Sequence, residues 1–437
     1  MSIDRLPGVV LTDHFLEVPL DHAVPDGERL TVYAREAVAP GREHDEKLPW
    51  LVYLQGGPGC ASPRPLGRDS WLVRALDDYR VLLLDQRGTG RSAPAGRQTL
   101  ALRGGPAEQA AYLAHFRADA IVRDAELFRR ELLGPGERWS VLGQSFGGFC
   151  ATTYLSYAPE SLREVMITGG LPGLTASADD VYRAAYPRVA RKNAAHYERY
   201  PQDVERVRRI AAHLREHTVR LPGGGRLTAE AFQALGLMLG TGTGSYVLHY
   251  LIEGAWVTGP AGPELADSFL QAAQGHLSYT ATPLYAVLHE AIYGQRSVSP
   301  KGTEWAAERV RAEFPEFDVD AALDGDRPLY FTGEMVFPWL FDTDPSLRPL
   351  KETAQLLAER TDWPDLYDAG RLAANEVPAA AAVYADDMYV DAGHSLETAR
   401  RIRGLRAWVT NEWEHDGLRV SEGAVLDRLI RMVRGEA

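Results

Sequence analysis

The sequence predicts an α/β fold, in which a mostly parallel sheet is flanked by helices and carries an inserted helical cap domain. Three observations support this prediction. Short, continuously apolar segments alternate with amphipathic helical ones over residues 1–170, which is typical of parallel strands joined by crossover helices. Long helical segments without a clear strand then fill residues 171–326. The α/β alternation returns over residues 327–437.

These changes of pattern suggest three parts. We expect residues 1–170 to form the first part of an α/β core and residues 327–437 to form its second part. Residues 171–326 would form a helical cap over the carboxyl ends of the strands. Substrate pockets of open α/β sheets lie at that edge.

The first part opens with an expected antiparallel hairpin, since residues 15–20 and 30–38 alternate between apolar and polar around the turn Pro25-Asp26-Gly27. The later segments lack alternation, which favours strands buried on both faces. The further elements expected here are strands at 51–54 and 81–84, a helix at 119–132 with Asp119 as its N-cap, a strand before Ser145, a helix at 149–157 and a strand at 165–167.

The second part repeats this alternation. Its expected elements are strands at 329–331, 378–384 and 405–410, helices at 347–358 and 395–403, and an amphipathic closing helix at 424–433.

Composition limits the possible partners. A formal net charge of -13 argues against nucleic acid or an anionic membrane as a partner. The two cysteines, Cys60 and Cys150, exclude a disulfide framework and fit a reducing compartment. No apolar run reaches the roughly 20 residues that span a bilayer, and the N-terminus does not resemble a signal peptide. We expect a cytoplasmic protein, whose oligomeric state the sequence does not reveal.

The stretch Gly143-Gln144-Ser145-Phe146-Gly147 follows the apolar run Val141-Leu142. This G-x-S-x-G pattern predicts a nucleophile elbow, in which a buried strand ends, the chain turns sharply at Ser145 and a helix begins. Small residues beside the serine are needed because the strand and the helix approach closely there. Ser145 is therefore the candidate nucleophile.

A nucleophilic serine needs a histidine as its base, and in this architecture the histidine follows a late strand. His394 and His415 both lie beyond the strand expected at 378–384. His394 comes only seven residues after Asp387, before the helix that should separate the last two strands. His415 follows the next strand, so we favour His415 as the base over His394.

The carboxylate that orients the base should follow the strand at 378–384. Asp386 and Asp387 are adjacent there and should point in different directions, so either could reach the histidine. Asp391 is a weaker candidate because it lies further from the strand end.

An oxyanion hole needs two backbone N–H groups, one from the residue after the nucleophile and one from a glycine-rich loop. Phe146 and the loop Gly56-Gly57-Pro58-Gly59 fit this description. The chain has no H-E-x-x-H motif and no paired His/Cys spacing, so we expect no metal and no cofactor.

Three motifs in this order resemble the long-form prolyl aminopeptidases (proline iminopeptidases) of the α/β-hydrolase superfamily. They are Gly56-Gly57-Pro58-Gly59, the run from Asp85 to Ser92 and Gly143-Gln144-Ser145-Phe146-Gly147-Gly148, and the resemblance extends through residues 333–339.

The resemblance implies an α/β-hydrolase fold and release of N-terminal proline from peptides through an acyl-enzyme. It implies the roles of nucleophile for Ser145, acid for Asp387 and base for His415. It also implies that Gly57 and Phe146 supply the oxyanion donors.

The resemblance further implies that carboxylates bind the charged imino group of the substrate, and Glu290 and Glu334 match those positions. Phe146, Tyr157 and Trp256 are candidates for an apolar slot around the proline ring. The long cap could also admit hydroxyproline or other small N-terminal residues. The alternatives are an esterase or a broader aminopeptidase on the same fold and, from another class, a non-catalytic binding protein.

Overall fold

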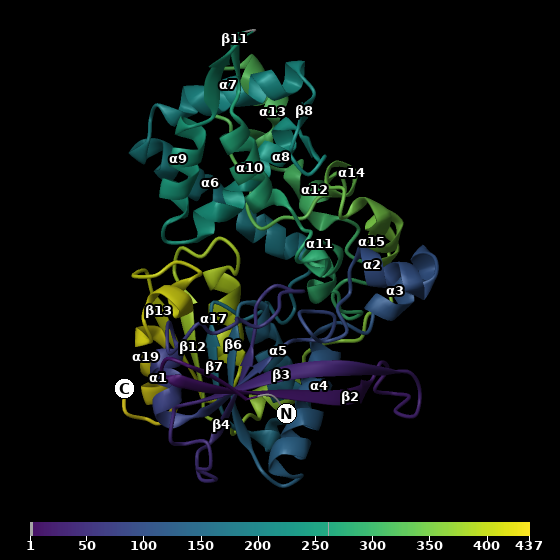
Figure 1. Ribbon diagram of the computed structural model, residues 1–437, viewed down its shortest axis with the longest axis vertical. Helices are drawn as coiled ribbons and strands as arrows, with labels where there is room; N and C mark the ends of the chain where they lie inside the picture. The colour runs from purple at the N-terminus through teal and green to yellow at the C-terminus, as the bar shows by residue number, and fades with distance from the viewer. Residues whose placement is uncertain (1–2, 261) are drawn as a thin grey trace.

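The computed structural model describes residues 3–260 and 262–437 (Figure 1). Nine strands form one sheet in the order β1-β2-β3-β5-β4-β6-β7-β12-β13. The strands are β1 (Ile3–Leu6), β2 (Val9–Pro19), β3 (Arg29–Val38), β4 (Trp50–Leu54), β5 (Arg80–Leu84), β6 (Trp139–Gln144), β7 (Leu162–Thr168), β12 (Ala379–Tyr384) and β13 (Leu405–Thr410).

The sheet is mixed. Strands β2 and β3 form the expected antiparallel hairpin, β1 adds an antiparallel edge and β3 pairs antiparallel with β5. All the other pairs, from β5 through β4, β6, β7 and β12 to β13, are parallel. This arrangement confirms the predicted α/β class with a mostly parallel sheet. The edge strand β1 was not expected from the sequence.

Helices cover both faces of the sheet and bury an apolar cluster on each. Those on one face are α4 (Ala118–Leu133), α5 (Phe146–Tyr157), α16 (Ala369–Ala373) and α17 (Ala392–Arg401). Those on the other face are α1 (Leu72–Asp78) and α19 (Ala424–Val433), which pack on each other as well as on the strands. Short helices α2 (Arg97–Leu100), α3 (Pro106–Leu113) and α18 (Gly417–Val420) lie in the connections.

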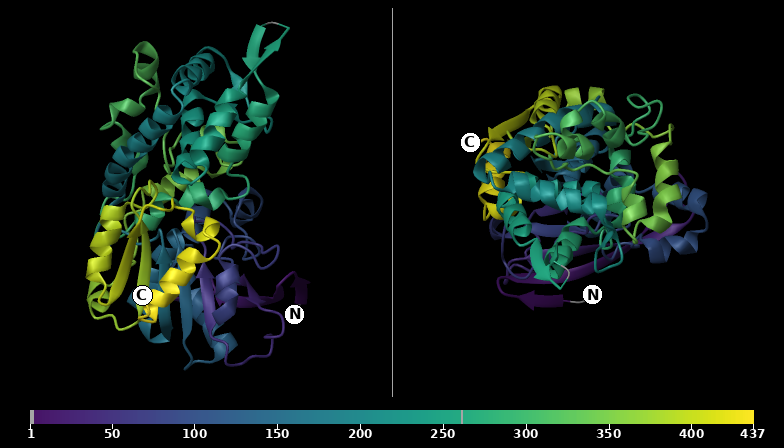
Figure 2. Two further views of the ribbon diagram at one scale, coloured as in Figure 1. Left: turned by 90° about the vertical axis from the view of Figure 1, so that its left-hand side faces the viewer. Right: turned by 90° about the horizontal axis from the view of Figure 1, so that it is seen from above.

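The chain leaves the sheet after β7 and returns to it at β12. Whereas α16 packs beside α5 and α17, the intervening residues 178–358 stand above the sheet as a mainly helical part (Figures 1 and 2). Its α-helices are α6 (Ala178–Arg199), α7 (Asp203–Glu216), α8 (Ala229–Gln233), α9 (Gly244–Glu253), α10 (Asp267–Leu277), α11 (Pro283–Leu288), α12 (Ala306–Arg311), α13 (Val319–Asp324), α14 (Leu340–Thr343) and α15 (Lys351–Ala358). Two hairpins accompany them, β8 (Val219–Arg220) with β9 (Arg226–Leu227) and β10 (Trp256–Gly259) with β11 (Gly262–Leu265).

The strand expected at 329–331 is wrong. This segment forms no regular element, and its backbone is hydrogen-bonded by side chains of the helical part. Asn193 of α6 accepts a hydrogen bond from the amide of Phe331 at 2.7 Å and donates one to its carbonyl at 2.9 Å. A short apolar run does not reveal whether its backbone partners are strands or side chains.

The N-cap predicted at Asp119 is also wrong. Helix α4 begins at Ala118 with Arg117 as its N-cap, and Asp119 lies in its first turn. The closing helix and the last strand, in contrast, have the predicted bounds, 424–433 and 405–410.

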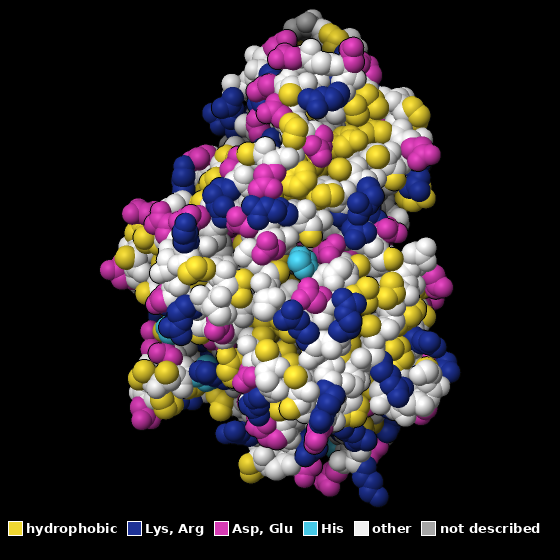
Figure 3. All heavy atoms as spheres, turned by 180° about the vertical axis from the view of Figure 1, so that it is seen from behind, with side chains coloured by type: hydrophobic (Ala, Val, Ile, Leu, Met, Phe, Trp, Pro, Cys, Tyr) yellow, Lys and Arg dark blue, Asp and Glu magenta, His cyan; other side chains and the backbone are white. Residues whose placement is uncertain are grey.

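The surface carries charges of both signs. On the face shown in Figure 3, acidic and basic side chains are interspersed, with hydrophobic side chains gathered between them in the upper part. Within the described residues, no helix combines the length and the apolar character that a bilayer crossing requires.

Candidate active site

Ser145 lies at a sharp turn between β6 and α5. Its backbone has φ 54° and ψ -126°, a conformation that L residues other than glycine rarely adopt. The two flanking glycines permit this turn. A Cβ at Gly147 would lie 1.9 Å from the carbonyl oxygen of Leu54, and one at Gly143 would lie 2.3 Å from that of Gly147. The local sequence therefore forms the expected elbow.

The glycine-rich loop after β4 lies against this turn. A Cβ at Gly56 would lie 2.8 Å from the Cβ of Ser145, so the loop and the serine are in direct contact. Gly57 has φ 140°, which requires glycine. Phe146 is the first residue of α5, where backbone N–H groups lack helical partners and favour negative charge. The glycine-rich loop that contains Gly57 and the first residue of α5, Phe146, thus both adjoin Ser145.

Asp387 and His415 form a buried pair. The Nδ1 atom of His415 lies 2.7 Å from Oδ2 of Asp387, and both side chains are almost fully buried. The other carboxylate oxygen of Asp387 accepts hydrogen bonds from the amides of Tyr389, at 2.8 Å, and Val390, at 3.1 Å. The turn after β12 therefore orients the carboxylate toward the histidine.

The environment of His415 has opposing effects on its pKa. Burial lowers the pKa, but the charge and the hydrogen bond of Asp387 raise it, and the charge of Glu334 adds to this. The net result is a pKa above the ordinary value of 6.5. A carboxylate that accepts from Nδ1 also leaves Nε2 without a proton, as a general base requires.

The other candidates lie elsewhere. The Asp386 side chain is 62% exposed and faces Arg188. Asp391 is the N-cap of α17 and accepts a hydrogen bond from the amide of His394 at 3.0 Å. His394 itself lies in the first turn of α17 and does not contact the Asp387–His415 pair through a hydrogen bond. Of the candidate carboxylates and histidines, only Asp387 and His415 are therefore paired with each other.

Gln144 is a neighbour of His415 that the sequence did not predict. Its Nε2 atom lies 3.3 Å from Nε2 of His415, whereas Ser145 Oγ forms no hydrogen bond with this histidine. Catalytic hydrogen bonds are often longer in the absence of substrate. The sequence did contain one sign that Gln144 would lie near the base, because it directly precedes Ser145 in the elbow.

Tyr389 also contacts His415 and was missed. The two rings meet edge to face, with their centroids 4.7 Å apart. The hydroxyl of Tyr389 donates to the carbonyl of Leu237, and a Cβ at Gly240 would lie 2.2 Å from the Tyr389 ring. The amide of His415 donates to the carbonyl of Gly240 at 3.2 Å. The 3₁₀ segment η3 (Ala234–Gly240) therefore holds both aromatic residues from the cap side.

Glu334 lies close to this pair. Its carboxylate accepts a hydrogen bond from the hydroxyl of Tyr285 at 2.5 Å. Its charge contributes to the raised pKa of His415 and, after burial, to that of Cys60, which rises to about 11. An acidic group whose charge acts on His415 can pair with a cation bound beside this histidine.

Glu290 has a different environment. It is buried, and its two oxygens accept hydrogen bonds from the amides of Ala306, at 3.0 Å, and Ala307, at 2.9 Å. Burial raises its pKa to about 7, although the two amides lower it. Both carboxylate oxygens are thus engaged at the start of α12.

Two of the aromatic candidates lie outside the site. The hydroxyl of Tyr157, at the end of α5, donates to the carbonyl of Asp365 at 2.6 Å. Trp256 packs against His213 and Arg209 in the outer part of the cap. Phe146 remains beside Ser145, and its ring meets that of Phe149 at 6.2 Å.

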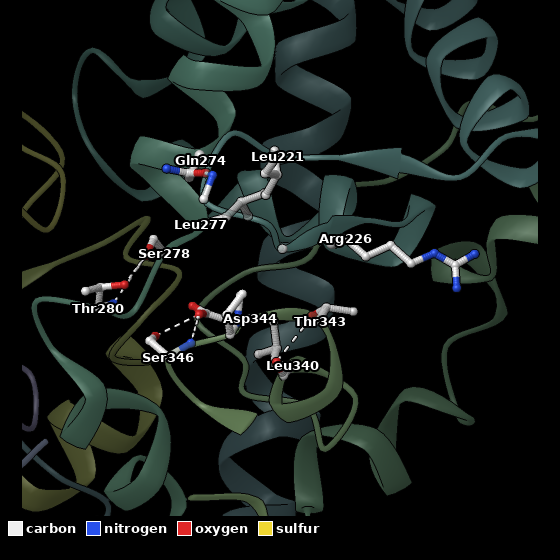
Figure 4. A pocket seen from close by; sticks show the side chains of 14 residues that line it. Leu221, Arg226, Gln274, Leu277, Ser278, Thr280, Leu340, Thr343, Asp344 and Ser346 are labelled. Atoms are coloured by element: carbon white, nitrogen blue, oxygen red, sulfur yellow. Dashed lines mark hydrogen bonds between the residues drawn. The ribbon is translucent and has the colours of Figure 1, made fainter. Parts of the chain in front are cut away.

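The helical part also holds a pocket of about 100 Å³ between the β8–β9 hairpin, the end of α10 and α14 (Figure 4). Leu221, Leu277 and Asp344 are among the residues that line it, and none of the candidate site residues does. Small-molecule sites are generally larger, about 300–1,000 Å³. Among the described residues, no group of three or more His, Cys, Asp or Glu side chains could hold a metal ion.

Residues 49–253 match the family of proteins with the alpha/beta hydrolase fold. The "Proline iminopeptidase" of Aeromonas sobria is 51% identical over 98% of this chain and 98% of its own. The "Proline iminopeptidase aneH" of Aspergillus aculeatus is 37% identical over 98% of this chain and 96% of its own. A solved structure, a thermophilic esterase from Thermogutta terrifontis, has 12% identity and a TM-score of 0.42, and covers 96% of this chain and 99% of that chain.

Proposed function

Because the chain belongs to the proline iminopeptidase family of α/β hydrolases, we propose that it releases N-terminal proline from peptides through an acyl-enzyme on Ser145. The observation that carries this proposal is the buried Asp387–His415 pair beside the elbow of Ser145. A serine, a histidine and a carboxylate in these positions are the parts of an acyl-transfer triad.

In the first half-reaction, Ser145 Oγ attacks the prolyl carbonyl carbon and His415 Nε2 takes the hydroxyl proton. The C–N bond of the resulting tetrahedral intermediate breaks, and His415 gives its proton to the leaving nitrogen. In the second, a water molecule attacks the acyl carbon, His415 takes a proton from it, and Ser145 leaves with that proton as proline is released. Asp387 keeps the imidazole in the required tautomer throughout.

The intermediate of each half-reaction carries an oxyanion. The N–H groups of Gly57 and Phe146 would donate to it, since Phe146 directly follows Ser145 and Gly57 directly follows Gly56, which lies against Ser145. Losing one such donor typically costs about 10²–10³-fold in kcat.

Glu334 would bind the charged imino group of the substrate. A buried cation needs a paired carboxylate, and Glu334 lies close enough to raise the pKa of His415. The role of Glu290 as a second carboxylate for the imino group stays a prediction. Its two oxygens already accept hydrogen bonds from backbone amides. An esterase would need neither group, since an ester substrate has no amino terminus.

Hydrolysis of prolyl-, hydroxyprolyl- and alanyl-naphthylamide beside a simple ester tests this proposal. We expect the prolyl compound to be cleaved fastest, with about a 10⁴-fold or greater loss of kcat in Ser145→Ala and His415→Ala. His394→Ala is the matched histidine control and should retain wild-type activity. Turnover of the ester alone would refute the peptidase assignment, and binding without turnover would favour a non-catalytic protein.

We further propose a cytoplasmic location, with peptides that carry an N-terminal proline as the partners and with neither nucleic acid nor a membrane among them. Both cysteines, Cys60 and Cys150, are free thiols, which fits a reducing compartment. The net charge of -13 supports the absence of nucleic acid and anionic membranes from its partners.

A further inference from the structure

Helix α6 of the cap presents two cationic side chains to the loops that follow β12 and β13. Arg188 and Lys192 are four residues apart and therefore lie on the same face of this helix. Both side chains are shielded, with only 19% and 15% of their surface exposed. A shielded cation needs acceptors or a partner of opposite charge, so their contacts show what this face of α6 holds.

Arg188 joins the two ends of the turn that carries Asp387. Its guanidinium donates to the carbonyl of Ala385 at 3.0 Å and to Oδ2 of Asp391 at 3.2 Å. Ala385 is the first residue after β12, and the other carboxylate oxygen of Asp391 caps α17. Asp387 lies between these two contacts, and its carboxylate is held by amides of the same turn. The direction in which Asp387 points therefore depends on a contact from the cap.

Lys192 holds the residue directly before the base. Its Nζ donates to Oε1 of Glu414, which precedes His415 in the loop after β13. Burial raises the pKa of Glu414, and the hydrogen bond and the charge of Lys192 oppose this rise. The charges of Asp387 and Asp386 add to the rise. Lys192 is thus the group that favours an ionised Glu414 beside other carboxylates.

These contacts balance a concentration of negative charge. The loops at 385–391 and 411–416 each contain three acidic residues and no lysine or arginine. Within residues 3–260 and 262–437, the only Lys or Arg side chains that form ion pairs with these loops are Arg188 and Lys192. Like charges that are partly shielded from water repel one another. The cap therefore supplies counter-charges that hold the two loops together.

We propose that Arg188 and Lys192 are positioning residues, which hold the loops of Asp387 and His415 in the arrangement that proton transfer requires. This inference rests on the proposed function, in that Ser145 and His415 carry out acyl transfer. Neither cation forms a hydrogen bond with the serine, the aspartate or the histidine of the triad, so each acts through the residue that it binds. Helix α6 of the cap is thus part of what makes His415 an effective base.

The test compares Lys192→Met with the full-length wild-type protein, because methionine keeps the length of the side chain and removes its charge. With prolyl-naphthylamide we expect kcat to fall by about 10²-fold, the cost of a displacement of about 1 Å. KM should stay unchanged, since the group that would bind the imino nitrogen is not altered. Lys192→Arg should restore most of kcat, and Arg188→Met should repeat the pattern of Lys192→Met.

The matched control is Arg183→Met, which should keep the wild-type kcat. Arg183 also lies on α6, but it pairs with Glu313 inside the cap at 2.8 Å. Full kcat in Lys192→Met would overturn the inference. A lower Tm together with a raised KM in that variant would also overturn it, because it would show a general loss of structure.

A double-mutant cycle tests whether Lys192 acts through Glu414. In a Glu414→Gln background, Lys192→Met should cost less than about threefold in kcat, because the ion pair is already absent. The same loss of about 10²-fold in both backgrounds would overturn the inference, since it would show that the two residues act independently.

Inactivation by phenylmethylsulfonyl fluoride tests the positioning without a peptide substrate. The reagent sulfonylates Ser145 Oγ, fluoride leaves and His415 takes the hydroxyl proton, so the rate constant reports how well the serine is activated. We expect this rate constant to fall in Lys192→Met about as far as kcat, and a wild-type rate constant would overturn the inference. If the fall occurs but the wild-type protein cleaves only a simple ester, the peptidase assignment fails while the positioning role is supported.

Discussion

The Nδ1 atom of His415 and the Oδ2 atom of Asp387 lie 2.7 Å apart, although 28 residues separate the two side chains in the sequence. Asp387 follows β12, and His415 follows the neighbouring parallel strand β13. Because the carboxyl ends of adjacent parallel strands meet at one edge of the sheet, the two loops converge beside Ser145. The predictions below start from this pair and from its neighbours.

Asp387→Asn should lower kcat for prolyl-naphthylamide by about 10⁴-fold, because an amide at this position permits the wrong histidine tautomer. Steady-state kinetics with purified protein measure this loss. The adjacent Asp386→Asn is the matched control, since the Asp386 side chain is 62% exposed and faces away toward Arg188. Equal losses in the two variants would contradict the assignment.

Gln144→Glu should shift the acidic limb of the pH profile of kcat/KM to higher pH. The base must be neutral, and its pKa is already above 6.5 because of Asp387. A second carboxylate placed where the Gln144 amide lies, 3.3 Å from His415 Nε2, would raise this pKa further. The uncharged Gln144→Met serves as the control and should leave the limb in place. A shift of the acidic limb to lower pH in Gln144→Glu would contradict the placement of residue 144 beside His415 Nε2.

Gly147→Ala should lower the free energy of unfolding by at least about 2–3 kcal/mol, since its Cβ would lie 1.9 Å from the carbonyl of Leu54. Thermal unfolding followed by circular dichroism measures this as a lower Tm. Gly275→Ala is the control in an open helical position, where nothing lies within 4 Å of the added Cβ. That variant should be neutral or gain about 0.5–1 kcal/mol from helix propensity.

Glu290→Gln should flatten the pH dependence of stability between about pH 4.5 and 7. The pKa of Glu290 is about 7 in the folded protein and 4.5 without the environment of the fold. Over this range the unfolded chain releases the proton that the folded protein keeps, so the free energy of unfolding falls as the pH rises. The full loss of unfolding free energy from ionising Glu290, on the order of 3 kcal/mol, is reached above pH 7.

Denaturant unfolding at several pH values measures this slope. Glu253→Gln, at an exposed position, should keep the wild-type slope. If Glu290→Gln instead kept the slope and raised KM for prolyl substrates, Glu290 would act as a binding residue after all.

Local pattern was sufficient for much of the architecture. The closing helix at 424–433 and the antiparallel hairpin follow from periodicity, because each buries apolar side chains at regular spacing. The last strand at 405–410 also has the predicted bounds, although only Thr410 is buried in it. The segment at 329–331 looked the same in sequence but pairs with Asn193 instead of a strand. Its partner lies 138 residues away, and no local property of the segment specifies it.

The sequence by itself determined the elbow at Ser145, because the spacing of its glycines follows from how closely strand and helix must approach. It also determined the order in which the acidic residue and the histidine follow. Only the tertiary structure decided which carboxylate faces His415, that Glu290 binds the start of α12, and that Gln144 and Tyr389 border the base. The reason is physical. Side-chain direction at a strand end and contacts between the cap and the sheet depend on the packing of segments up to 271 residues apart, as Gln144 and His415 are.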